Sequence, residues 1–184
     1  QYNIPYTLSD SLPNLFDHFA VRYALDYMRL AMGDRSRAVF LRIMNKPSRY
    51  ISRDMLMEDP VDYDKLRFRL RNKPSVVDHL DKLEADAKLL SKMRPWAALN
   101  FIRNFIGYDQ YIKEYAEYRQ LDAGEMYDVL DEFAYMIKDM ESYEALFAFI
   151  RSYQELLFKQ QEKNRLKKGV SLMTMHSAKG LEFD

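Results

Sequence analysis

The chain of 184 residues contains no cysteine, only five glycines and six prolines, and its formal net charge is zero. The absence of cysteine excludes disulfides, cysteine-ligated zinc, iron–sulfur clusters and cysteine nucleophiles. It is compatible with a reducing compartment, and we expect a cytoplasmic protein. Because glycine and proline are sparse, the composition disfavours an all-β protein built on many tight turns and favours long helices.

Long hydrophobic runs are also missing. No stretch approaches the roughly 20 apolar residues that span a bilayer, and the start of the chain carries no signal-peptide pattern. We therefore expect no membrane partner. Hydrophobic residues nevertheless make up 48% of the chain, which is enough to bury a core and excludes general disorder.

The charges are segregated although they sum to zero. Residues 29–73 contain twelve basic residues (Lys or Arg) and six acidic residues (Asp or Glu). Residues 108–146 contain three basic and eleven acidic residues, and residues 151–179 contain seven basic and two acidic residues. One interpretation is a set of solvated helix faces. The other is that the basic ends face a polyanion while the acidic middle faces away from it.

The spacing of apolar residues is helical through most of the chain. It predicts helices near residues 17–32, 34–44, 52–57, 75–90, 95–107, 111–118, 125–140 and from 142 onward, with 59–73 the least regular part. The expected N-caps are Asp34, Ser52, Ser75 and Ser142, and Pro95 is expected in a first helical turn. Short apolar segments at residues 4–8 and 170–175 predict strands near both ends.

These patterns predict a mainly α protein with three segments. Residues 11–166 form a helical domain, and residues 1–10 and 167–184 supply strands to the sheet of a neighbouring domain. Apolar strands without partners suggest that the helical domain is an insertion and that the chain is a piece of a longer protein.

The segment after the second strand carries groups that suit a nucleotide or a nucleic-acid backbone. The side chains of Thr174, His176 and Lys179 are donors for phosphate oxygens. Gly180 permits a close backbone approach to a ligand, and the Glu182 carboxylate is an acceptor for ribose hydroxyls. On residue types alone, an ordinary polar loop is the simpler interpretation.

The order of these residues points to a family. The string TMHSAKGLEF at residues 174–183 closely resembles motif V of superfamily 1A helicases, the UvrD/PcrA/Rep family. The resemblance implies that Thr174 and His176 contact single-stranded DNA. It also implies that Lys179, Gly180 and Glu182 bind ATP, with Glu182 on the ribose.

For the parent protein, this resemblance implies an ATP-dependent 3′→5′ DNA helicase that uses ATP and Mg²⁺ and binds single-stranded and junction DNA. The sequence has no GxxxxGK[ST] phosphate loop, and its one string of DExx form, DEFA at residues 131–134, falls on a predicted acidic helix face where we expect no catalytic pair and no metal-binding motif. We therefore expect this piece to be inactive by itself and to need motor domains 1A and 2A as partners.

Weaker resemblances extend over the rest of the chain. The letters NIPY at residues 3–6 resemble the strand that leaves motor domain 2A just before the helical 2B subdomain. Residues 41–49, LRIMNKPSR, resemble a 2B segment that normally ends in Pro-x-Arg-Gly-Ile-Gly, a turn associated with contacts to duplex DNA. The fold class that the resemblance implies is a helical 2B-type subdomain flanked by strands of a RecA-like motor domain.

This chain departs from the family at that turn, where it reads PSRYIS. Tyr50 and Ser52 replace glycines that let amide groups approach phosphates closely. We expect Arg49 to supply most of the charge for duplex binding, with Tyr50 and Ser52 as hydroxyl donors. The alternative is that Tyr50 only packs on the next helix.

Two functional interpretations stay open. The first is a DNA-contacting 2B subdomain that swivels on hinges near residues 9–13 and 165–169. The second is a regulatory protein-interaction module of a helicase or helicase–nuclease, with no DNA binding of its own and a protein partner on the acidic face. We expect no metal site, because His18 and His79 lie on separate predicted helices without a second ligand at suitable spacing.

Overall fold

The structure, a computed structural model, describes residues 6–8, 14–166 and 170–172. The chain divides into two compact units, one of residues 15–146 and one of residues 1–14 together with 147–184. The described residues are mainly α-helical, which confirms the mainly α part of the predicted fold class.

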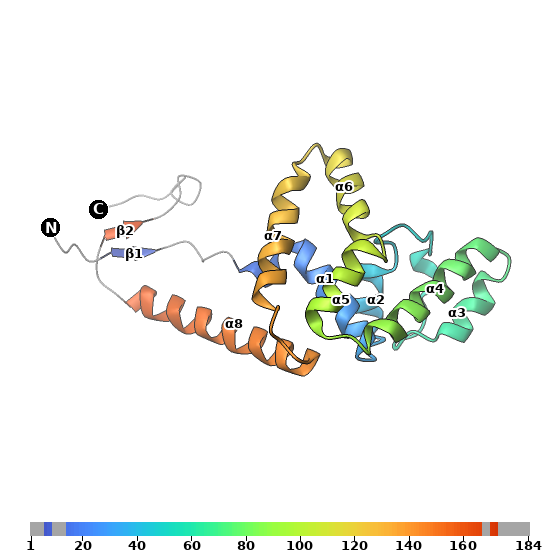
Figure 1. Cartoon of the computed structure of the whole chain (residues 1–184), viewed down its shortest axis with the longest axis horizontal. Helices are drawn as coiled ribbons and strands as arrows, with labels where there is room; N and C mark the ends of the chain where they lie inside the picture. Colours follow the sequence, from blue (N-terminus) through green and yellow to red (C-terminus); the bar gives the residue numbers. More distant parts are fainter. Residues whose placement is uncertain (1–5, 9–13, 167–169, 173–184) are drawn as a thin grey trace. The chain divides into compact units, whose positions relative to one another are not determined.

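The unit of residues 15–146 is entirely helical in its described elements. Along the chain these are η1 (Leu15–Asp17), α1 (Phe19–Ala31), α2 (Arg37–Ile43), η2 (Arg53–Met55), α3 (Tyr63–Leu70), α4 (Pro74–Leu90), α5 (Pro95–Asn104), α6 (Tyr108–Arg119), α7 (Ala123–Met136) and the first turn of α8 (Tyr143–Leu166). Helix α1 is central, since it contacts α2, α4, α5 and α7 (Figure 1). Its Ala20 and Ala24 are fully buried, and their small side chains allow neighbouring helices to approach closely.

Buried aromatic side chains connect the helices of this unit. The Tyr108 hydroxyl on α6 donates a hydrogen bond to the carbonyl of Ala20 on α1 at 3.0 Å. The Tyr143 hydroxyl at the start of α8 donates to the carbonyl of Leu90, the last residue of α4, at 2.7 Å. Each tyrosine therefore buries a large ring and still satisfies its polar atom.

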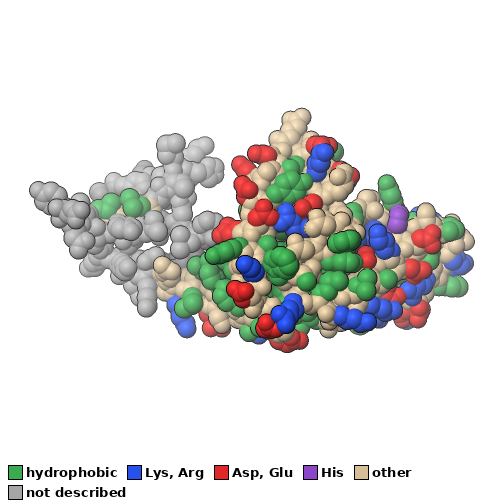
Figure 2. All heavy atoms as spheres, in the orientation of Figure 1, with side chains coloured by type: hydrophobic (Ala, Val, Ile, Leu, Met, Phe, Trp, Pro, Cys, Tyr) green, Lys and Arg blue, Asp and Glu red, His purple; other side chains and the backbone are tan. Residues whose placement is uncertain are grey.

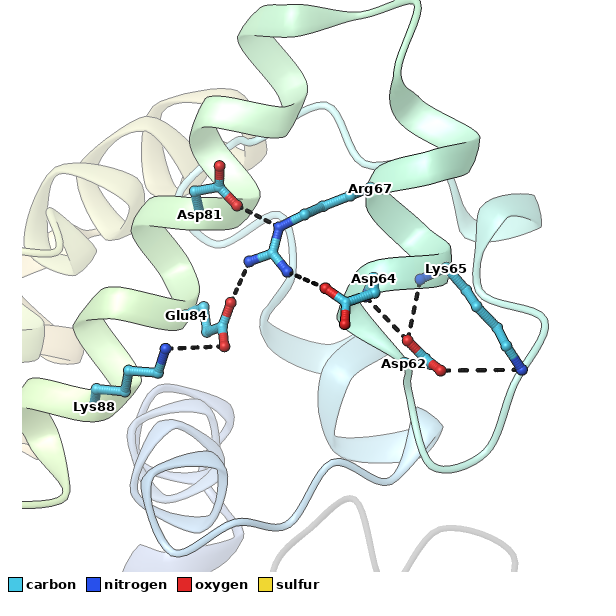
Figure 3. A network of polar contacts seen from close by, with 7 residues as sticks. All are labelled: Asp62, Asp64, Lys65, Arg67, Asp81, Glu84 and Lys88. Atoms are coloured by element: carbon cyan, nitrogen blue, oxygen red, sulfur yellow. Dashed lines mark hydrogen bonds and ion pairs between the residues drawn. The ribbon is translucent and has the colours of Figure 1, made fainter.

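Helices α3 and α4 are joined by a charge network around Arg67 (Figure 3). The Arg67 guanidinium donates to Asp64 at 2.9 Å, to Asp81 at 2.6 Å and to Glu84. The carboxylates of Asp81 and Glu84 lie on α4, and hydrogen bonding to them raises the pKa of Arg67 further. Exposed ion pairs contribute little one by one, but a shared guanidinium fixes how the two helices meet.

The hairpin of α6 and α7 carries most of the acidic stretch, and Figure 2 shows acidic side chains along it. Part of this charge is neutralised inside the unit. The Arg103 guanidinium on α5 donates to Asp109 at 3.0 Å and also binds Asp131. Arg94 pairs with Glu141 at 3.0 Å.

The other unit holds two short strands and most of α8. Strand β1 (Tyr6–Leu8) pairs in parallel with β2 (Val170–Leu172), with Tyr6 opposite Val170 and Leu8 opposite Leu172. Parallel neighbours require a long crossover connection. Here the whole helical unit lies in the chain between the two strands.

Several helices match their predicted positions. Pro95 lies in the first turn of α5, and the Ser142 hydroxyl accepts a hydrogen bond from the amide of Ala145 at the start of α8. The structure corrects others. Residues 59–73 are not irregular, because they contain α3, which begins after the N-cap Asp62.

Two expected caps are also corrected. Ser36, not Asp34, caps α2, and its hydroxyl accepts from the amide of Val39. Helix α4 begins at Pro74, so Ser75 lies inside it. Ser52 does occupy the N-cap position of the short helix η2, but it makes no side-chain capping bond.

Candidate nucleic-acid interface

The PSRYIS segment lies in a turn of residues 45–52 that connects α2 to η2 and is called here the 45–52 turn. One side chain closes it. The side-chain Oδ1 of Asn45 accepts hydrogen bonds from the backbone amides of Arg49 at 3.2 Å and Ile51 at 3.0 Å. The side-chain Nδ2 of Asn45 donates a hydrogen bond to the backbone carbonyl of Ile51 at 2.8 Å. Ile51 itself is buried, so the turn is anchored from below.

Arg49 holds the same turn from the interior. Its Nη1 donates to the carbonyls of Ile43 at 3.1 Å, Met44 at 3.3 Å and Pro47 at 3.3 Å, and its Nη2 donates to the Tyr27 hydroxyl at 2.8 Å. Two of these carbonyls belong to the end of α2, where helical carbonyls lack partners and a positive charge is favourable. Arg49 therefore ties α1, the end of α2 and the turn together.

This geometry changes the role that we assign to Arg49. The sequence predicts it as the main cation for duplex DNA, but only 5% of its surface is exposed. A guanidinium that donates to three carbonyls and a hydroxyl inside the protein would have to leave the interior to reach a phosphate. Arg49 positions the turn, and we do not propose it as a direct DNA contact.

Tyr50, in contrast, lies on the surface with 73% of its area exposed. Its backbone has φ = 56°, in the left-handed region that glycine adopts without penalty. For a tyrosine this conformation costs about 1–2 kcal/mol. The family pattern has glycine at this position, so the side chain has changed while the backbone keeps a conformation suited to glycine.

The Tyr50 ring contacts helix α4. It stacks on the His79 imidazole with ring centroids 6.5 Å apart and an interplanar angle of 29°. The alternative that Tyr50 packs on a helix is thus correct for one face of the ring, although it is α4 and not the next helix in sequence. Ser52 is partly exposed at the end of the turn.

A second buried charge lies beside Arg49. Asp86 on α4 has 7% of its surface exposed, and its Oδ2 has no hydrogen-bond partner among the described residues. Burial raises the pKa of its carboxyl group, while the charges of Lys82 and Arg49 act in the opposite direction. Burial also raises the pKa of Tyr27, against the effect of Arg49.

The structure brings together only part of the predicted site. Arg49, Tyr50 and Ser52 lie in one turn. The residues predicted for single-stranded DNA and ATP, namely Thr174, His176, Lys179, Gly180 and Glu182, lie outside the described residues. Among the described residues, no group of three or more acidic or histidine side chains is arranged to hold a metal ion.

Sequence reasoning missed three residues that build this turn. Tyr27 has the spacing of a core residue, and nothing in the sequence shows that its hydroxyl binds Arg49. Asparagine is common in turns, so Asn45 does not stand out in the sequence. His79 stands 29 positions after Tyr50, so only the packing of α4 reveals their contact.

Comparisons with known proteins define the class. The model of the UvrD-like helicase C-terminal domain family matches residues 1–184, and the chain therefore belongs to this family. It is also 28% identical over 206 aligned residues to the ATP-dependent DNA helicase PcrA of Staphylococcus aureus strain Mu50, and equally to PcrA of Staphylococcus epidermidis. Each alignment covers 98% of this chain but only 27% of the relative's length.

None of the helices in the described part of the chain is both long and apolar enough to cross a bilayer. This finding concerns residues 14–166, where the helices lie.

The position of Arg49 predicts a large effect on stability. Arg49→Ala should lower the free energy of unfolding by roughly 3 kcal/mol, because the carbonyls of Met44 and Pro47 and the Tyr27 hydroxyl each lose the hydrogen bond that they accept from the guanidinium. Arg49→Lys should recover only part of this loss, since an ammonium group lacks the planar fork of donors. Urea denaturation followed by circular dichroism measures both.

The matched control for these variants is Arg53→Ala, which removes an exposed arginine four residues further along the chain. It should change the free energy of unfolding by less than about 0.5 kcal/mol. Equal and small effects of Arg49→Ala and Arg53→Ala would contradict the buried role of Arg49.

Proposed function

We propose that this chain is the helical 2B-type subdomain of an ATP-dependent 3′→5′ DNA helicase, together with two strands and motif V of its motor domain 2A. The family match over the whole chain carries this proposal. Residues 1–10 and 167–184 are assigned to the motor domain, and residues 11–166 to the helical subdomain.

The pairing of β1 and β2 supports an insertion. Two neighbouring parallel strands of one sheet are separated in sequence by the whole helical unit. Parallel strands are normally covered on both faces, yet Val170 and Leu172 are about half exposed in the described structure. A larger sheet in the longer protein would cover them.

The tail supplies the nucleotide chemistry in this proposal. Thr174 and His176 contact the backbone of single-stranded DNA, and Lys179, Gly180 and Glu182 lie at the ATP, with Glu182 on the ribose. The ATP phosphates and Mg²⁺ need groups that this chain does not contain, so motor domain 1A is the required partner. These roles rest on the resemblance of residues 174–183 to motif V.

The 45–52 turn is the surface that we assign to duplex DNA. It keeps the backbone conformation at Tyr50 that the glycine-bearing family pattern favours, and it is fixed from below by Arg49 and Asn45. The cation that we now assign to this surface is Arg53, which is exposed and makes no ion pair among the described residues. Ser52 supplies a hydroxyl donor to this surface, and Tyr50 presents its exposed ring.

The second candidate is a protein-interaction module without DNA binding. The observation that favours it is the α6–α7 hairpin, which exposes Tyr118 and Tyr135 among acidic side chains. Tyrosine is enriched in protein interfaces. Against it, Arg103 and Arg94 already form ion pairs with three of the acids in this region.

Salt dependence of DNA binding separates the two candidates. The chain should bind a duplex with a single-stranded tail, and the logarithm of the association constant should fall by roughly 0.9 per neutralised phosphate for each unit of log salt concentration. Arg53→Glu should weaken binding and lower this slope. Fluorescence anisotropy at several salt concentrations measures both quantities.

The control for Arg53→Glu is Arg119→Glu, which reverses an exposed charge at the end of α6. It should leave DNA affinity unchanged. No detectable binding at low salt would reject the DNA-contact proposal and favour the protein-interaction module.

The ribose role of Glu182 is tested in the longer protein that contains the motor domains. Glu182→Ala should raise the KM for ATP about tenfold, the loss expected for one charge-assisted hydrogen bond. Ser177→Ala, at a neighbouring position without an assigned contact, serves as the control. An unchanged KM in a steady-state ATPase assay of Glu182→Ala would show that the carboxylate does not bind the nucleotide.

A further inference from the structure

Tyr50 and His79 form an exposed aromatic pair on the surface of the helical unit. One face of the tyrosine ring lies against the imidazole, and most of the side chain remains open to solvent. Aromatic rings of this kind are the surfaces on which proteins stack unpaired bases. The pair brings together residues from the 45–52 turn and from α4.

The backbone of Tyr50 has an unusual conformation for a tyrosine. Among the described residues, Gln120 is the only other non-glycine residue with a positive φ, and it ends helix α6, where such a conformation is common. Tyr50 has no such local reason. Its neighbours Arg49 and Ile51 are bonded to Asn45, so the turn fixes the strained residue and points its ring outward. Strained residues of this kind concentrate at binding and catalytic sites.

The imidazole is positioned by packing. His79 is partly buried on α4, and its Nδ1 is buried without a hydrogen-bond partner among the described residues. The burial of Nδ1 places this edge of the imidazole against the protein, while the ring is stacked with that of Tyr50. A rigid two-ring platform loses little conformational entropy when a third ring stacks on it.

The charges near the pair are mixed. Arg53 and Lys82 are exposed cations, but Asp54 and Asp78 are exposed acids in the same segments. Such a surface attracts phosphates only weakly. Stacking, rather than charge, is the interaction that this pair offers, and stacking suits any base because every base has an aromatic face.

We infer that Tyr50 and His79 form a stacking platform for an unpaired nucleobase of DNA that lies next to the duplex. The inference rests on the proposed function, in which the 45–52 turn faces DNA. It goes further by assigning the turn a preference for unpaired bases over uniform duplex. A protein partner is the less suitable occupant, since one exposed ring is far smaller than the roughly 800 Å² that each side of a stable interface buries.

The test compares the chain on two DNA substrates, a blunt duplex and the same duplex with a short single-stranded tail that begins with 2-aminopurine. Tyr50→Asn removes the ring and introduces asparagine, a residue that tolerates the left-handed backbone conformation. It should weaken binding of the tailed substrate about tenfold, abolish the fluorescence change of 2-aminopurine and leave the blunt duplex within twofold of wild type. The slope of affinity against salt should not change, because no phosphate contact is lost.

Two variants serve as controls. Tyr50→Phe keeps the ring and should bind both substrates within twofold of wild type. Tyr118→Asn removes another highly exposed tyrosine, on α6, and should have no effect. Thermal unfolding of each variant checks that the chain is folded.

Three results would overturn the inference. If Tyr50→Asn bound the tailed substrate as tightly as wild type, the stacking platform would be rejected, while the proposed DNA contact of the turn would stand. Equal weakening on both substrates would show that Tyr50 supports the turn and does not stack on a base. Failure of the wild-type chain to bind either substrate would reject the inference and the proposed function together.

Discussion

The Arg49 guanidinium is the group on which the arrangement of the helical unit around the 45–52 turn depends. It donates to the carbonyls at the end of α2, to the turn itself and to the Tyr27 hydroxyl of the central helix. Tyr27 in turn donates to the carbonyl of Lys46 at 2.7 Å. A buried cation is tolerated only where such partners surround it. The conformation of the turn therefore depends on the buried position of Arg49, and that buried position depends on the carbonyls of the turn and of α2.

This constraint explains how a tyrosine can occupy a backbone conformation that suits glycine. Hydrogen bonds from Arg49 and to Asn45 fix the backbone on both sides of Tyr50, which then accepts a conformation that is unfavourable for its side chain. A position that glycine would occupy with only its amide exposed here presents an aromatic ring. Under the proposed function, the turn therefore offers DNA a ring and a hydroxyl group in place of the backbone donors of a glycine turn.

The sequence predicts the helices whose signals are local. Proline in the first turn of α5 and the Ser142 cap of α8 are examples, because each acts within one helical turn. Helix α3 is not evident from the sequence because four of its eight residues are charged, and only Tyr63, Leu66 and Leu70 are buried. Its stability depends on Arg67 and the carboxylates of α4, a contact that sequence spacing does not reveal.

The candidate site was predictable in position but not in detail. The motif at residues 174–183 and the pattern around Arg49 identify the family, which the match over the whole chain shows. The pattern also selects the 45–52 turn, whose contact with DNA stays a prediction. It does not show which charged residue is buried, because the sequence cannot distinguish an arginine that binds phosphate from one that binds backbone carbonyls. The roles of Arg49 and His79 come from tertiary packing.

The central claim is that the 45–52 turn, and not the acidic α6–α7 hairpin, faces DNA. Hydrogen–deuterium exchange of the chain with and without a tailed duplex tests it most directly. The account predicts slower exchange for the amides of residues 48–52 when DNA is bound, and unchanged exchange for residues 108–136. Protection of the hairpin without protection of the turn would contradict the account.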